Sequence, residues 1–174
     1  MKAAMVHRIG GGHDADVVAS PEQISVETNV PVPSPAEGEV LLQVKAASVN
    51  PVDWKLMNGD FPGKEPGTGF GLDVCGTVAK LGEGVTSLQV GDVVYADVIM
   101  TNKAKGSGSW AEYCLCQAVA AHNIPKNVTP TEAASLSLVG LTAIQGLTRQ
   151  GGIQKGSKVR WCGVEKMKWR FQFG

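Results

Sequence analysis

The feature that most limits the possible folds is a regular alternation of apolar and polar residues near the middle of the first half. Four apolar residues share one face at a period of two: Val40, Leu42, Val44 and Ala46. This alternation predicts a strand with one buried face. Shorter strand-like segments, separated by turns rich in glycine and proline, are 1–7, 24–26, 72–81, 90–96 and 110–116. Through Ile124 the sequence therefore predicts a compact, mostly β, barrel-like domain.

Glycine marks a special position in one of these strands. Gly76 stands inside the segment 72–81. Glycine weakens a strand interior, and there it usually marks a bulge or a place where another backbone comes close. We therefore expect a bulge or a close backbone contact at Gly76.

The period changes after residue 128. Thr129-Pro130-Thr131-Glu132 has the pattern of a helix start, with a threonine N-cap, proline at the first helical position and a glutamate that closes a capping box. A short helix should follow, interrupted by Gly140, and helical character should resume from Leu141 to Gln150. Lys158-Val159 then resembles the approach to a new strand. The sequence thus predicts a switch from β structure to the opening of an α/β unit.

Composition excludes several functional classes. The chain has 174 residues, 43% of them hydrophobic, which is enough to bury a core. The formal net charge is zero, so nothing favours nucleic acid or an anionic membrane as a partner. No long apolar run or export leader is visible, so we expect a soluble, cytoplasmic protein. The four cysteines suit reduced, buried thiols rather than a disulfide framework.

A polar cluster follows the strand at 40–46. Ser48, Asn50, Asp53 and Lys55 surround a proline in the segment 48–55. Loops on a rigid scaffold often carry binding and catalytic groups, which favours a functional role. The structural alternative is an ordinary exit from a strand into a turn, in which Asp53 bonds backbone amides. Composition alone leaves both interpretations open.

Five motifs in order resemble one superfamily. They are Val49-Asn50-Pro51-Val52-Asp53-Trp54-Lys55, Gly71-Leu72-Asp73-Val74-Cys75-Gly76, Val90-Gly91-Asp92-Val93-Val94-Tyr95, Gly108-Ser109-Trp110-Ala111-Glu112-Tyr113 and Leu138-Val139-Gly140-Leu141-Thr142-Ala143. Together they resemble the N-terminal, GroES-like half of a medium-chain dehydrogenase/reductase, in the zinc-independent branch of quinone oxidoreductases and enoyl reductases. The resemblance implies a mainly β fold with a few helices. A GroES-like, partly open β-barrel would be followed by the first helices and the strand start of an incomplete Rossmann domain.

The choice of branch depends on two positions. Zinc-dependent members place a cysteine about where Asn50 stands, and Gly-His-Glu about where Gly71-Leu72-Asp73 stands. An amide and an alkyl side chain are not zinc ligands. The resemblance therefore implies no metal site.

The resemblance also implies a cofactor and a reaction. The expected reaction is hydride transfer from NADPH to a small-molecule quinone or enone. Asn50 corresponds to the family position beside the nicotinamide and ribose, and Thr142 to the threonine that meets the nicotinamide from the helix side. Lys55 resembles a lysine of enoyl-reducing members and is the candidate catalytic residue, because its ammonium could contact a cofactor or substrate oxygen.

The domain organisation follows from the same resemblance. We assign 1–125 to the GroES-like domain, 126–159 to the start of the nucleotide-binding domain and 160–174 to a divergent tail. No G-x-G-x-x-G follows Val159, and this turn is what lets backbone amides approach a pyrophosphate. We therefore interpret the chain as a truncated form with an incomplete cofactor site and little activity alone.

Two alternative functions stay open. The chain could be a catalytically inactive remnant that acts as a binding module. Apolar faces of the helices 132–150 would then be exposed and would favour self-association or another partner. It could instead be a trans-acting enoyl reductase of polyketide synthesis, which the residues 53–55 permit.

Overall fold

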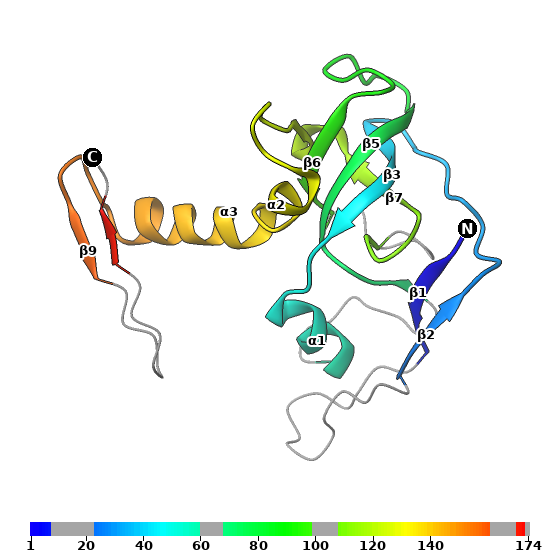
Figure 1. Ribbon diagram of the computed structural model, residues 1–174, viewed down its shortest axis with the longest axis horizontal. Coiled ribbons are helices and arrows are strands. Elements are labelled where there is room, and N and C mark those ends of the chain that lie inside the picture. The colour runs from blue at the N-terminus through cyan, green and yellow to red at the C-terminus, as the bar shows by residue number, and fades with distance from the viewer. Residues whose placement is uncertain (8–22, 60–67, 99–107, 161–169, 173–174) are drawn as a thin grey trace. The chain divides into compact units, whose positions relative to one another are not determined.

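The computed structural model describes residues 1–7, 23–59, 68–98, 108–160 and 170–172 (Figure 1). It contains two units, Met1–Leu138 and Val139–Gly174, which are described separately. Antiparallel strands dominate the first unit, and within the described residues its sheets do not close into a complete barrel. The predicted mainly β, partly open architecture is confirmed. The domain boundaries expected from the sequence stay a prediction.

The core of the first unit is a five-stranded sheet in the order β7-β3-β5-β6-β8. Its members are β3 (Glu39–Ala47), β5 (Asp73–Leu81), β6 (Val93–Asp97), β7 (Tyr113–Gln117) and β8 (His122–Asn123). The strand predicted at 40–46 is β3, which pairs with both β5 and β7. One face of the sheet buries a cluster that includes Val40, Leu42, Val74, Val78, Val94 and Cys114.

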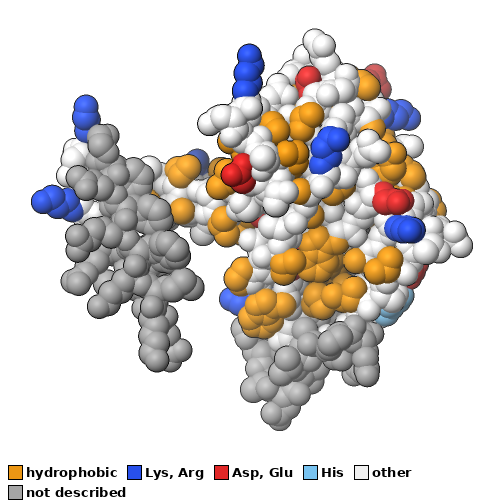
Figure 2. Space-filling view, in the orientation of Figure 1, with side chains coloured by type: hydrophobic (Ala, Val, Ile, Leu, Met, Phe, Trp, Pro, Cys, Tyr) orange, Lys and Arg blue, Asp and Glu red, His pale blue; other side chains and the backbone are white. Residues whose placement is uncertain are grey.

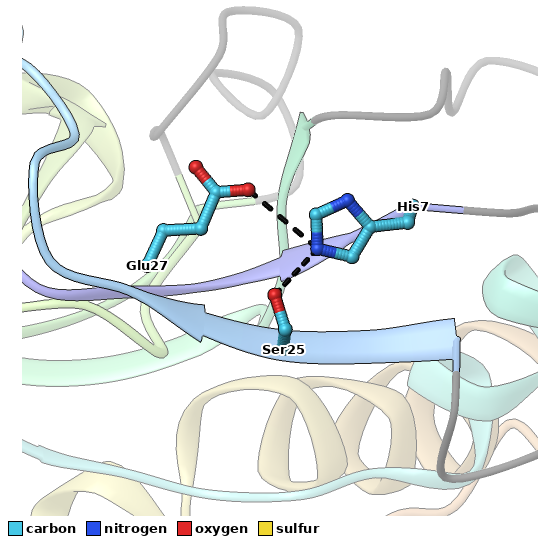
Figure 3. A network of polar contacts seen from close by, with 3 residues as sticks. All are labelled: His7, Ser25 and Glu27. Carbon is cyan, nitrogen blue, oxygen red and sulfur yellow. Dashed lines mark hydrogen bonds and ion pairs between the residues drawn. The ribbon is translucent and has the colours of Figure 1, made fainter.

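A smaller sheet has the order β2-β1-β4, with β1 (Ala3–Val6), β2 (Ile24–Glu27) and β4 (Thr68–Gly69). At its edge, Nε2 of His7 lies 2.5 Å from Oγ of Ser25 and 3.5 Å from Oε1 of Glu27 (Figure 3). The His7 and Glu27 side chains are nearly half exposed. Because exposed polar pairs of this kind contribute little to stability, we give this contact only a minor role in holding β1 and β2 together.

The backbone approach expected at Gly76 is confirmed. Gly76 pairs with Val44 of β3, and the register shifts between Val44 and Ala46. A Cβ placed on Gly76 would lie 2.7 Å from the carbonyl oxygen of Gln43. Glycine is therefore required here by space as well as by the irregular pairing.

The segment 51–58 is a helix, whereas the polar cluster in the sequence indicates a loop. It forms the helix α1 (Pro51–Asn58), which directly follows β3 in Figure 1. Asn50 is the N-cap, proline occupies the first turn, and the Asp53 carboxylate accepts the Asn50 backbone N–H at 2.7 Å. Gly59 ends the helix in a left-handed conformation with φ of 83°. These are the ordinary start and stop signals of a helix.

The later helices correct a second expectation. The capping box at Thr129 and Glu132 is confirmed and starts α2 (Pro130–Ala134). Helix α3 (Ser137–Gln145) runs through Gly140, so the predicted interruption there is wrong. The break lies at residues 135–136, and a new helix starts at Ser137. The side chain of Asp73 stabilises this start by accepting the backbone N–H of Leu138. A glycine in a helix interior costs only about 1 kcal/mol, which does not force a break.

The two helices differ in exposure. In α2, Ala133 and Ala134 are buried and pack with Cys75 of β5, so the exposed face expected from the sequence is absent there. Along α3, by contrast, Val139, Leu141 and Ile144 are 46%, 50% and 61% exposed. The expected exposure of apolar residues therefore holds for α3 and for Leu136 just before it, which is 51% exposed, but not for α2.

The second unit continues α3 into a π-helical turn, η3 (Gly146–Gln150), and then β9 (Lys158–Arg160). The strand expected after Lys158 is thus present, and it pairs antiparallel with β10 (Arg170–Gln172). Most of the tail from 161 onwards lies outside the described residues. Within the described residues, no helix has the length and apolar character needed to cross a membrane.

We predict that Gly76→Ala lowers the free energy of unfolding by roughly 1–3 kcal/mol, since the added Cβ meets backbone atoms that cannot move aside. Gly140→Ala is the matched control, because a Cβ there meets nothing within 4 Å. It should be neutral or stabilise the chain by up to about 1 kcal/mol. Urea denaturation measures both effects. Equal losses in the two variants would contradict the close contact at Gly76.

Candidate functional site

The candidate site is built around a buried acidic side chain. Asp73 opens β5 and is fully buried. Its Oδ2 accepts hydrogen bonds from the Ser48 hydroxyl and from Nδ2 of Asn50, each at 2.8 Å. Its Oδ1 accepts the backbone N–H of Leu138 at 2.7 Å. These donors compensate for the removal of the carboxyl group from water, which is costly when no partner is present.

Hydrogen bonds hold both the backbone and the side chain of Asn50. Its backbone N–H donates to Asp53, and its side-chain nitrogen donates to Asp73 and, at 3.2 Å, to Ser48. Only 4% of the residue is exposed. An amide held in this way cannot sample other rotamers without losing buried hydrogen bonds. Asn50 is therefore preorganised.

The segment before Asn50 is fixed from a third direction. The indole N–H of Trp110 donates to the Ser48 carbonyl oxygen at 2.9 Å, and the ring lies against Phe70 with centroids 6.2 Å apart. Gly71 has φ of 91°, and a Cβ there would lie 2.4 Å from Ser109 Oγ. Because Gly71 has no side chain, the segment 109–110 can pack closely against it. The Trp110 indole can then reach the Ser48 carbonyl oxygen.

The structure places the predicted residues in three different surroundings. Asn50 lies in the Asp73 network, and Asp53 caps α1, which is the structural role considered for it above. Lys55 lies half-buried on α1 with its Nζ 5.7 Å from the Trp54 ring centroid. Among the described residues, Lys55 donates no hydrogen bond to the Asp73 network. Thr142 is exposed on α3 and belongs to the second unit, whereas Asn50 belongs to the first.

Sequence reasoning missed Asp73 as a residue of the site. The available signal was an acidic residue at the start of an otherwise apolar strand, next to Leu72 and Val74. Charged residues are seldom fully buried unless they are paired, so a buried strand that begins with aspartate indicates a partner elsewhere. Nothing in the local pattern identifies that partner.

The cysteines of the first unit are buried. Cys75, Cys114 and Cys116 are free thiols. Burial raises the pKa of Cys116 to about 12, with further contributions from the Asp97 and Glu39 carboxylates. Burial, followed by the neighbouring Cys116, also raises the pKa of Cys114 well above its usual range. In the part of the chain that is described, no three His, Cys, Asp or Glu side chains are grouped to hold a metal ion.

Comparisons with known proteins match this chain to one domain family. Residues 36–126 match the alcohol dehydrogenase GroES-like domain. The chain is 35% identical over 158 residues to a chloroplast envelope quinone oxidoreductase homolog of Arabidopsis thaliana, covering 88% of this chain and 44% of that protein. It is 40% identical over 132 residues to a chloroplastic NADPH-dependent alkenal/one oxidoreductase of the same plant, covering 72% of this chain and 34% of the relative.

The fold is also similar to that of solved structures. The quinone oxidoreductase from Coxiella burnetii superposes with a TM-score of 0.74 at 28% sequence identity. The match covers 90% of this chain and 46% of that one. This chain therefore spans less than half the length of these similar proteins.

We predict that the native thiols resist alkylation at pH 8. In a Cys162→Ser background, iodoacetamide should modify them at least roughly a hundredfold more slowly in buffer than in denaturing urea, because burial keeps them protonated and covered. The folded-state pKa of Cys116 is raised to about 12, so its contribution to stability is complete below about pH 8.5 and is lost as the pH rises towards that value. Mass spectrometry measures the labelling. Rapid labelling of native protein would contradict the burial.

Proposed function

This chain belongs to the medium-chain dehydrogenase/reductase superfamily through its alcohol dehydrogenase GroES-like domain, and we propose that it contributes the substrate side of an NADPH-dependent, zinc-independent quinone or enone oxidoreductase. One observation carries the proposal. By the family resemblance, zinc-dependent members place a cysteine about where Asn50 stands; in this chain the neutral amide of Asn50 is held in a buried hydrogen-bond network. Because the chain spans less than half of its relatives, the activity is a proposal for this chain.

The residues present fit the nicotinamide end of the cofactor. NADPH supplies a hydride. The nicotinamide carboxamide and the ribose hydroxyls are neutral hydrogen-bonding groups, and we assign their recognition to the amide of Asn50 and the hydroxyl of Thr142. Asn50 is held rigidly by Asp73, so it can orient a bound ring without a further loss of side-chain freedom.

Lys55 is the proposed catalytic residue toward the substrate. Addition of hydride to the β-carbon of an enone moves an electron pair onto the carbonyl oxygen, and the resulting enolate takes a proton from water at the α-carbon to give the saturated ketone. A cation near that oxygen stabilises the charge that develops. The Lys55 ammonium lies on α1, five residues after Asn50 in sequence, and its only aromatic contact among the described residues is with Trp54. A quinone substrate would be reduced to the hydroquinone by the same hydride and a proton.

The phosphate end of the cofactor lacks an evident site in this sequence. No G-x-G-x-x-G occurs in the chain, and such a turn normally brings backbone N–H groups to the pyrophosphate. We therefore propose that this chain alone binds NADPH weakly and turns it over slowly. The trans-acting enoyl reductase interpretation uses the same residues and chemistry.

We predict saturable but weak NADPH binding by calorimetry at millimolar cofactor. Asn50→Ala and Thr142→Ala should each weaken it by roughly 2–10-fold, as expected for one lost hydrogen bond. Thr148→Ala is the matched control for the helical segment, because it removes a threonine hydroxyl to which the family resemblance gives no contact with the cofactor; this hydroxyl donates to the Ile144 carbonyl oxygen. Lys55→Met should leave NADPH affinity unchanged and lower whatever enone reduction is measured.

Three outcomes would contradict this proposal. Absence of any saturable heat would remove NADPH as a ligand of this chain. Unchanged binding in both alanine variants would remove Asn50 and Thr142 from its site. NADPH turnover at ordinary enzyme rates would contradict the proposed weakness of the isolated chain, while supporting the reaction class.

A second candidate function is self-association, which the exposure of α3 favours. Hydrophobic side chains are visible along this helix in the space-filling view (Figure 2). They include Val139, Leu141 and Ile144. We propose a second copy of this chain as the partner, because the net charge is zero and copies do not repel one another strongly.

We predict that the chain forms dimers or larger species in sedimentation velocity, and that Leu141→Glu with Ile144→Glu shifts it towards the monomer. Val119→Glu is the control, since Val119 is 87% exposed but lies on a different element. The double variant and the control should therefore differ. A wild-type chain that stays monomeric at high concentration would contradict the proposal.

A further inference from the structure

We propose that Asp73 is a positioning residue that fixes the polarity of Asn50, so that Asn50 offers a hydrogen-bond acceptor to its ligand. The identity of that ligand rests on the proposed function, whereas the effect on Asn50 does not. The inference adds a residue to the site and states which chemical group the site recognises.

The hydrogen bonds determine which way the Asn50 amide faces. Oδ2 of Asp73 is an acceptor for the Ser48 hydroxyl and for the Asn50 amide nitrogen. An amide has one donating end and one accepting end, and only the nitrogen can bond to an acceptor. The nitrogen of Asn50 therefore faces inward to Asp73, and the carbonyl Oδ1 faces away from it. One lone pair of this oxygen serves the capping box of α1, in which the Asn50 side chain accepts the backbone N–H of Asp53, and the second lone pair is the one that we assign to a ligand.

The network holds this arrangement firmly. Asp73 is fully buried and Asn50 is 4% exposed, so turning the amide over would place its oxygen against a buried acceptor. Ser48 is itself held by the Trp110 indole through its carbonyl oxygen. The polarity of Asn50 is thus set by residues from several segments and does not depend on a bound ligand.

The consequence concerns specificity. A carbonyl oxygen accepts hydrogen bonds, so the group that Asn50 recognises must be a donor, such as a ribose hydroxyl or a carboxamide N–H. A carboxylate or another acceptor would be rejected, because its lone pairs would face those of the amide oxygen.

Asp73 also has a purely structural bond, which uses its other oxygen. Oδ1 accepts the N–H of Leu138 in the first turn of α3, and side chains commonly accept the backbone N–H groups at the start of a helix. The two roles can therefore be separated. An asparagine at this position keeps one oxygen for Leu138, but it presents an N–H₂ group to Ser48 and Asn50.

The test is nuclear magnetic resonance of the Asp73→Asn variant of the full chain. The exchange with water of the Asn50 side-chain N–H₂ protons should accelerate by roughly tenfold or more, because two donors then face each other. The backbone N–H of Leu138 should exchange at its wild-type rate. Asp92→Asn is the matched control, because the Asp92 carboxylate accepts the Gln89 backbone N–H at 2.9 Å, in a turn apart from the Asp73 network. It should leave Asn50 unchanged. Unchanged Asn50 exchange in folded Asp73→Asn would overturn the proposal.

Two further measurements keep the test decisive. If Asp73→Asn does not fold, the wild-type chain provides the test: its Asn50 N–H₂ protons should exchange roughly tenfold more slowly than those of exposed Asn127, and equal rates would overturn the proposal.

The double variant Asn50→Asp with Asp73→Asn restores one donor facing one acceptor. It should recover at least half of the melting temperature lost by Asp73→Asn, and no recovery would count against the pairing.

NADPH titration separates the two proposals. A wild-type chain that shows no NADPH response but protected Asn50 protons supports the role of Asp73 and removes the cofactor assignment. NADPH binding that is equally tight in wild type and folded Asp73→Asn overturns the role of Asp73 in recognition.

Discussion

The buried carboxyl group of Asp73 is the interaction on which the first unit depends. A carboxyl group that leaves water without partners destabilises a protein by several kcal/mol, and this side chain is fully buried. Its donors come from Ser48 after β3, from Asn50 at the start of α1 and from Leu138 in α3. The network can form only when these separate elements are in place. The same hydrogen bonds therefore specify the fold and hold the candidate site.

Close backbone packing makes the network possible. Gly76 lets β5 lie against β3 where the pairing is irregular, and Gly71 makes room for the Ser109–Trp110 segment. Larger residues at either glycine would separate segments that Asp73 and Trp110 connect. The site is thus carried on paired strands and a helix N-terminus, which hold side chains more precisely than a free loop does.

Sequence patterns identified those features whose cause is local. The alternation in 40–46, the helix start at Thr129 and the glycine at Gly76 were all predicted, because each depends on neighbouring residues. Helix α1 was missed although Asn50 and the following proline carry ordinary start signals; the polar cluster was interpreted as a loop. The role of Asp73 could not be predicted from periodicity, because its partners are 23, 25 and 65 residues away in sequence.

The neighbouring residues Leu72 and Asp73 show how the scaffold supports an amide site. Leu72 is buried in an apolar cluster with Phe70 and Leu56, whereas Asp73 enters the polar network. A thiolate at the position of Asn50 would need no orientation, since its sulfur is an acceptor from every direction. An amide has two unlike ends and is selective only when one is fixed. A buried acceptor beside it supplies that constraint, and the Asp73 carboxylate is such an acceptor for the amide nitrogen of Asn50.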